Sequence, residues 1–212
     1  MRKLFIVFLV FVQSLIAREA GLWVIVLGDS LTEGLGVRRQ STYPFLLEEG
    51  LAANGFGASV INAGVSGSTS AGAARRLQTY LDQSPEVLVL ALGANDGLRG
   101  LPLINMEKNL SEVIDLAQSH SMQVVLAGMK IPPNYGREYA NKFKRVFSKL
   151  AQKYSLPWIP FLLEGVAGIR SLNQADGIHP NAEGHKIIAK TVLSKILEVL
   201  KSKSSESIQI AP

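Results

Sequence analysis

The sequence predicts a doubly wound α/β domain, in which helices cover both faces of a parallel β-sheet. Apolar runs alternate five times with segments whose apolar residues recur at helical spacing. The apolar runs contain no regular polar alternation, as expected of strands that are buried on both faces. The 212 residues also suit one domain, and we find no internal repeat.

Five segments are predicted strands. The first is rich in β-branched residues and ends before Gly28, and the third follows Pro85 and has the strongest pattern. The fifth is weaker because Pro160, which has no N–H to donate, interrupts it. In chain order the predicted strands are residues 22–27, 59–62, 86–92, 123–127 and 157–162.

Helical periodicity fills the segments between and after the strands. The first predicted helix has Gly55 beyond its end as a stop signal, and the last has a strongly amphipathic pattern. The predicted helices span residues 43–53, 70–81, 106–118, 137–154 and 182–200. The domain is therefore expected to cover residues 21–200, followed by a polar, frayed tail over residues 201–212.

Residues 1–20 have the layout of a secretory signal peptide. Arg2 and Lys3 precede an uninterrupted apolar run over residues 4–12, and Ala17 and Ala20 are candidate cleavage sites. An uncleaved membrane anchor and a buried first strand are the alternatives. The run is shorter than the roughly 20 residues that a membrane span needs. We therefore expect a periplasmic or secreted protein with no stable membrane span after cleavage.

Composition excludes several classes of protein. The chain has no cysteine, which excludes a disulfide framework, a cysteine-rich zinc site and a cysteine nucleophile. Removal of residues 1–17 lowers the formal net charge from +5 to +3. The basic residues of one predicted helix are expected to form a solvated face, and no nucleic-acid partner is expected. These residues are Lys142, Lys144, Arg145 and Lys149.

Four loops at the predicted carboxyl edge of the sheet carry candidate chemistry, because ligands bind at that edge in such folds. In the first loop Ser30 follows strand one directly and is a candidate nucleophile. Alternatively, Asp29 or Ser30 only caps a helix. The second loop, residues 62–70, is rich in glycine and lets backbone N–H groups approach a ligand. It lacks the lysine of a phosphate-binding loop, and a plain turn is its alternative.

The third and fourth loops add an amide and an acid–base pair. Asn95 is placed to donate its side-chain N–H to an oxyanion, or else Asn95 and Asp96 serve only the turn. Asp176 and His179 are three residues apart, so the carboxylate can orient the imidazole. Structural roles are expected for the other two histidines, His120 at a helix end and His185 within the last helix. The histidines are too few to favour a metal site.

These residues resemble the sequence blocks of the GDSL, or SGNH, hydrolases. Residues 28–31 (GDSL) match the first block, Gly67 the second, Asn95 the third and Asp176-x-x-His179 the fifth, all in the same order. Further segments are similar to a periplasmic group of acyl-CoA thioesterases, lysophospholipases and arylesterases. These segments span residues 95–100, 133–137 and 176–181.

The resemblance implies a flavodoxin-like three-layer sandwich with a five-stranded parallel sheet. It implies that Ser30 is the nucleophile, His179 the base and Asp176 its orienting acid. It further implies an oxyanion hole made by the backbone N–H groups of Ser30 and Gly67 and the side chain of Asn95. No metal or other cofactor is expected. The substrate is expected to be a small acyl ester or thioester, with a lipid among the candidates, and a monomer is the default.

Residues 98–104 and 131–139 are candidate walls of an acyl groove, with ordinary packing as the alternative. The sequence leaves two other functions open. One is a carbohydrate O-deacetylase of the same family. The other is a flavodoxin-like binding module without catalysis, which would have no need of the Asp176–His179 pair.

Overall fold

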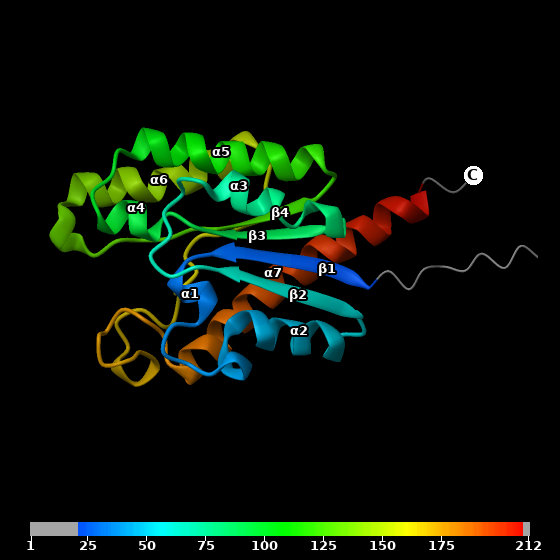
Figure 1. The fold of residues 1–212 in the computed structure, drawn as a ribbon, viewed down its shortest axis with the longest axis horizontal. Coiled ribbons are helices and arrows are strands. Elements are labelled where there is room, and N and C mark those ends of the chain that lie inside the picture. Colours follow the sequence, from blue (N-terminus) through cyan, green and yellow to red (C-terminus); the bar gives the residue numbers. More distant parts are fainter. Residues whose placement is uncertain (1–20, 210–212) are drawn as a thin grey trace, which may run out of the picture.

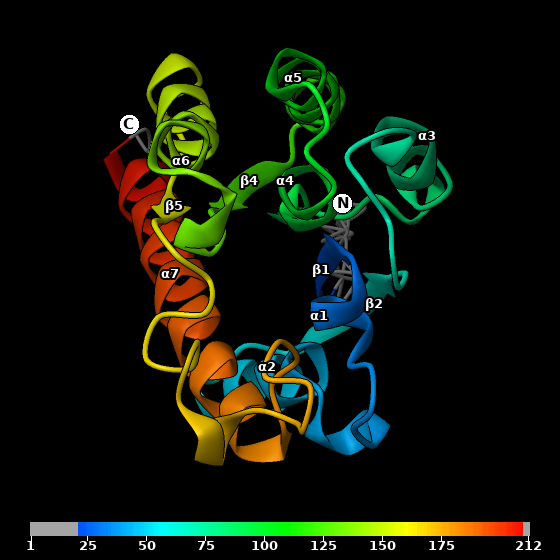
Figure 2. The same ribbon diagram turned by 90° about the vertical axis from the view of Figure 1, so that its left-hand side faces the viewer.

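The computed structural model describes residues 21–209 and contains the predicted five-stranded parallel sheet (Figures 1 and 2). The strand order is β2-β1-β3-β4-β5, and every neighbouring pair is parallel. The strands are β1 Leu22–Gly28, β2 Ala58–Gly64, β3 Val87–Ala91, β4 Gln123–Ala127 and β5 Trp158–Ile159. The predicted signal segment, residues 1–20, lies outside the described residues.

Helices lie on both faces of the sheet, which gives the predicted three layers. Helices α2 and α7 pack together on one face, whereas α3, α5 and α6 cover the other (Figures 1 and 2). Two short helices, α1 and α4, follow β1 and β3 directly. The α-helices are α1 Ser30–Glu33, α2 Tyr43–Ala53, α3 Ala73–Gln78, α4 Ala94–Leu98, α5 Leu103–Ser119, α6 Arg137–Lys153 and α7 Ala182–Gln209.

The core lies on both sides of the central strands. Every residue of β3 is buried, and so are residues 24–28 of β1. Two layers of helices remove these strands from water, which explains their continuous apolar runs. Phe143 and Phe147 of α6 pack edge to face above the sheet, with ring centroids 5.4 Å apart.

Several element boundaries differ from the prediction for local reasons. The helix predicted over residues 70–81 is limited to α3, because Gly72 takes a left-handed conformation and Ser70 bonds elsewhere. Strand β5 has only two residues, since Pro160 cannot extend the ladder. Helix α7 continues to Gln209, so the backbone of residues 201–209 is helical where a frayed tail was expected.

The strand order places a topological switch point at the end of β1. The chain moves from β1 outward to β2 and then crosses to β3 on the other side of β1. The loops after β1, β2 and β3 therefore lie together, at the side of the molecule that faces the viewer in Figure 2. Ligands bind at such a point in open α/β sheets. Within residues 21–209, no helix is both long and apolar enough to cross a bilayer.

Candidate active site

Ser30 is held by a tight turn between β1 and α1. Asp29 caps α1, since its Oδ1 accepts the Leu31 N–H at 3.1 Å, and Ser30 is the first residue of the helix. Only glycine fits at position 28, because a Cβ there would lie 1.8 Å from Thr32 Oγ1. The two interpretations of this loop are thus compatible: Asp29 caps the helix, and the cap fixes Ser30 at the carboxyl edge of the sheet.

A chain of hydrogen bonds joins Ser30, His179 and Asp176. Ser30 Oγ lies 2.9 Å from His179 Nε2, and His179 Nδ1 lies 2.7 Å from Asp176 Oδ2. With its Nδ1 proton donated to the carboxylate, the imidazole has Nε2 free to accept the serine O–H. The backbone N–H of His179, the His179 ring and the N–H of Ile178 hold the pKa of Asp176 down at about 2.

The histidine loop is fixed to the rest of the site by Gln174. Its backbone N–H donates to His179 O at 2.8 Å. Its side-chain amide donates to Leu35 O at 2.6 Å and to Pro180 O at 3.0 Å. Because Leu35 follows α1, Gln174 connects the loop of His179 to the helix that begins with Ser30.

Asn95 and Gly67 lie on loops that meet the Ser30 turn. The Asn95 Nδ2 group donates to Ser68 O at 3.1 Å and lies 3.4 Å from Asp29 Oδ2. The Gly67 loop is attached to β1 by the Val65 N–H, which donates to Gly28 O at 3.2 Å. Gly67 has a φ of +75°, a conformation that favours glycine.

Three candidate N–H donors therefore lie on the Ser30 turn or on the two loops that meet it. The first N–H groups of a helix have no acceptor within it, and that of Ser30 belongs to this set. Among residues 21–209, no acceptor engages the Gly67 N–H. Together with the Asn95 amide, these groups can receive a negative charge that develops beside the serine.

Asp29 is an ionisable group beside Ser30 that is almost fully buried. Its side chain is 2% exposed. Burial raises the pKa of Asp29 to about 6, although the Leu31 N–H and the charge of His179 act in the opposite direction. The sequence indicated only a helix cap for this residue.

Arg76 of α3 is a second contributor that the sequence pattern did not reveal. Its Nη2 donates to Gly28 O at 2.9 Å and also to Ala63 O, so it joins the carboxyl ends of β1 and β2. Partial burial lowers the pKa of its guanidinium. On the same side of the site, Glu33 accepts from both the backbone N–H and the hydroxyl of Ser66.

The remaining histidines have the expected structural positions. His120 follows α5 on the surface, with Nδ1 2.9 Å from Leu116 O. His185 is buried in α7, where its Nδ1 accepts the Tyr43 N–H at 3.2 Å and its ring stacks on Tyr43. Tyr43 in turn shares a 2.6 Å hydrogen bond with Thr32 of α1. His185, Tyr43 and Thr32 therefore form one buried, connected group that joins α7 and α2 to α1, the helix that begins with Ser30.

The two segments predicted to line an acyl groove do meet. Tyr139 donates its hydroxyl to Leu101 O at 3.2 Å, and Leu101 and Tyr135 are exposed. Arg99 connects this region to the Gly67 loop by donating to Gly67 O at 2.8 Å.

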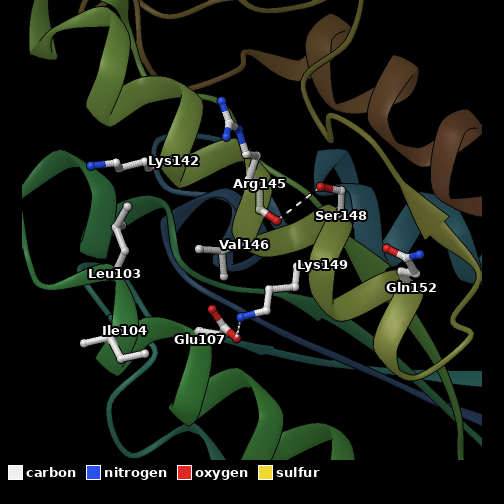
Figure 3. Close-up of a pocket in the computed structure, with 9 residues that line it drawn as sticks. All are labelled: Leu103, Ile104, Glu107, Lys142, Arg145, Val146, Ser148, Lys149 and Gln152. Atoms are coloured by element: carbon white, nitrogen blue, oxygen red, sulfur yellow. Dashed lines mark hydrogen bonds and ion pairs between the residues drawn. The ribbon is translucent and has the colours of Figure 1, made fainter.

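A separate groove of about 450 Å³ runs between α5 and α6 (Figure 3). Ile104, 71% exposed, lies at this groove, but neither Ser30 nor His179 contributes to its lining. Lys142 pairs with Glu138, and Lys149 pairs with Glu107, each at 2.6 Å. These pairs agree with the predicted solvated face. No cluster of potential metal ligands occurs in the described part of the chain, residues 21–209.

Comparison with known proteins shows similarity over most of the chain. Residues 26–187 match the family model described as "GDSL-like Lipase/Acylhydrolase family". The chain is 40% identical over 158 residues to "Esterase TesA" of Pseudomonas aeruginosa, an alignment that covers 74% of this chain and 79% of that protein. It is 34% identical over 167 residues to "Thioesterase 1/protease 1/lysophospholipase L1" of Escherichia coli strain K12, covering 78% and 79%.

A solved structure agrees with these sequence matches. It is the crystal structure of the psychrotrophic esterase EstA from Pseudoalteromonas sp., inhibited by monoethylphosphonate. The TM-score is 0.80 at 33% sequence identity, and the superposition covers 84% of this chain and 98% of that one.

Proposed function

The chain belongs to the GDSL-like lipase/acylhydrolase family, and we propose that it hydrolyses carboxylic esters and thioesters with Ser30 as its nucleophile. The enzyme class, a serine hydrolase that acts on esters, follows from the family. The observation that carries the assignment to Ser30 is the continuous chain of hydrogen bonds from Ser30 Oγ through His179 to Asp176. A serine alone is a weak nucleophile at neutral pH, and an adjacent oriented base activates it.

In the acylation step His179 acts first as a base and then as an acid. Its Nε2 takes the proton from Ser30 Oγ as that oxygen forms a bond to the carbonyl carbon of the substrate. Asp176 holds the Nδ1 proton of the ring and stabilises the imidazolium that results. Collapse of the tetrahedral intermediate breaks the bond to the leaving alcohol or thiol, which receives the proton from Nε2. Ser30 then carries the acyl group.

Deacylation repeats these roles with water. His179 Nε2 takes a proton from a water molecule as its oxygen attacks the acyl carbon, and Ser30 Oγ recovers the proton as it leaves. In both steps the carbonyl oxygen carries a negative charge in the intermediate. The N–H groups of Ser30 and Gly67 and the Asn95 amide are the proposed donors to that oxygen. Removal of one such donor typically costs about 2.7–4 kcal/mol of transition-state stabilisation.

The N-terminal pattern supports export of the enzyme to the periplasm or beyond the cell. Residues 1–17 have the basic start and the apolar run of a signal peptide. An exported enzyme does not meet cytosolic acyl-CoA, so lysophospholipids and small esters are the favoured natural substrates. N-terminal sequencing of the protein from a periplasmic fraction tests export: a start after residue 17 or 20 supports it, and a start at Met1 contradicts it.

Hydrolysis of p-nitrophenyl esters of increasing chain length tests the function. Ser30→Ala is expected to remove nearly all turnover while the folded signal in circular dichroism stays unchanged. Ser148→Ala is the matched control, since among residues 21–209 that hydroxyl bonds only to Arg145 O on the surface of α6. Turnover retained by a pure, folded Ser30→Ala sample would overturn the assignment. Activity on acetylated sugars with none on longer acyl esters would instead indicate the O-deacetylase.

A further inference from the structure

We propose that Asp29 is a positioning residue that sets the orientation of the Asn95 amide, and so aims an N–H group of Asn95 at the oxyanion. This inference rests on the proposed function, because it concerns a donor to the charge that forms beside Ser30. Asp29 immediately precedes the nucleophile, and its carboxylate takes no proton in the mechanism described above.

Both oxygens of Asp29 act as acceptors, and each faces a different part of the site. Oδ1 accepts the Leu31 N–H at 3.1 Å and so caps the helix that starts with Ser30. Oδ2 faces Asn95 Nδ2 at 3.4 Å. A carboxylate can accept at both oxygens at once, whereas the side-chain amide of asparagine has one acceptor oxygen and one donor nitrogen.

The orientation of the Asn95 amide follows from its two acceptors. Nδ2 faces the carbonyl oxygen of Ser68 and the carboxylate of Asp29, which both require an N–H. A flipped amide would place Oδ1 against these two oxygens and would lose both interactions. The bond to Ser68 O, at 3.1 Å, is the shorter of the two, and the orientation is fixed only when both oxygens accept. The longer 3.4 Å contact is weak enough for an oxyanion to replace Asp29 as the partner of that N–H.

Asp29 also lies in the field of other charges, which suggests a competing explanation for any loss of activity. His179 on the histidine loop, Arg76 on α3 and the Tyr43 hydroxyl on α2 interact with it electrostatically. If Asp29 acted only through its negative charge on the His179 imidazolium, every neutral replacement would cost about the same. If it acted only as a helix cap, asparagine would be the mildest replacement, because it is isosteric and caps well.

Two neutral variants separate these possibilities. Asp29→Ser keeps an acceptor for the Leu31 N–H and is too short to touch Asn95. Asp29→Asn also keeps the cap, because the new amide oxygen accepts the Leu31 N–H. The NH₂ group of the new amide then faces the NH₂ group of Asn95, and two donors oppose each other. Asn95 then either keeps its bond to Ser68 O with the two NH₂ groups opposed, or flips, loses that bond and presents Oδ1 to the oxyanion. Both arrangements displace the N–H that would face the oxyanion. We therefore expect Asp29→Asn to be the more damaging variant, although it is the closer isostere.

The experiment measures kcat and KM of both variants with a p-nitrophenyl ester, in the wild-type and Asn95→Ala backgrounds. Thermal unfolding checks that each variant is folded. The expected kcat falls about 100-fold for Asp29→Asn and about 10-fold or less for Asp29→Ser, with KM nearly unchanged. In the Asn95→Ala background each Asp29 variant is expected to lower kcat by no more than about threefold, because the residue through which it acts is gone.

Other outcomes overturn the proposal. An Asp29→Asn enzyme that is as active as Asp29→Ser, or more active, contradicts the orienting role. The same holds if the two substitutions lower kcat as much without Asn95 as with it. A wild-type enzyme without Ser30-dependent turnover would overturn the proposed function itself. An active wild type with the wrong order of variants overturns only the role of Asp29.

Discussion

Replacement of His185 by Asn is expected to change how the stability of the fold depends on pH. The amide oxygen of Asn occupies nearly the position of the imidazole Nδ1, so it can still accept the Tyr43 N–H. The substitution therefore removes a titrating group while keeping its hydrogen bond. Burial in α7, and secondarily the charge of His179, lowers the pKa of His185 from 6.5 to about 4.

The size of the effect follows from this shift. Between pH 6.5 and 4 the unfolded chain binds a proton at His185, whereas the folded chain keeps the ring neutral. The wild type therefore loses stability as the pH falls, by about 3 kcal/mol between pH 7 and pH 4. Asp29 acts in the opposite direction, because its raised pKa of about 6 lets the folded chain bind a proton first. Protonation of Asp29 between pH 7 and pH 4 therefore adds about 2 kcal/mol to the free energy of unfolding.

Urea unfolding at pH 4, 5, 6 and 7 measures these two opposing terms. As the pH falls from 7 to 4, the free energy of unfolding of His185→Asn is expected to rise by about 3 kcal/mol relative to that of the wild type. That of Asp29→Asn is expected to fall by about 2 kcal/mol relative to the wild type. Tyr43→Phe is the matched control: it removes the hydrogen bond to Thr32, and burial raises the pKa of Tyr43 far above this range. Its difference from wild type is therefore expected to stay constant. A constant difference for His185→Asn would refute the reasoning.

Three further substitutions test the site. Asn95→Ala is expected to lower kcat about 100- to 1,000-fold with little change in KM, as measured by steady-state kinetics. An effect on KM alone would show that Asn95 binds substrate and does not stabilise the oxyanion. Asp176→Asn is expected to lower kcat roughly 10⁴-fold because the imidazole loses the partner that fixes its tautomer, and a loss below tenfold would contradict that role. Gly64→Ala should destabilise the fold by about 1–3 kcal/mol in urea unfolding, because the new Cβ would lie 2.1 Å from Glu33 N. Unchanged stability would show that the backbone has room to move.

The order of strands and helices was predictable because buried strands are encoded by continuous apolar segments. The apolar runs of β1 and β3 reflect their position between two layers of helices. Helix ends were harder to predict where a tertiary contact decides them. Ser70 leaves the predicted helix because its N–H and hydroxyl both bond to the buried carboxylate of Asp96, a residue that follows another strand.

The candidate site was predictable to the extent that its residues follow strands or lie close in sequence. Ser30 follows β1, and Asp176 and His179 share one loop. The contribution of Arg76 was not predictable, because it stands beside Arg75 on a short helix and only the fold aims it at β1 and β2. A signal for the burial of His185 was present: Ile188 and Val192, three and seven residues further along α7, are buried on the same helix face.

The central claim is that Ser30 is an activated nucleophile, and covalent trapping tests it most directly. The protein is treated with a fluorophosphonate, and intact-mass spectrometry with peptide mapping then locates the adduct. We predict one organophosphonyl group per chain, attached to Ser30 Oγ, and no adduct in Ser30→Ala. An adduct on another residue, or unmodified Ser30 in an enzyme that hydrolyses esters, would contradict the claim.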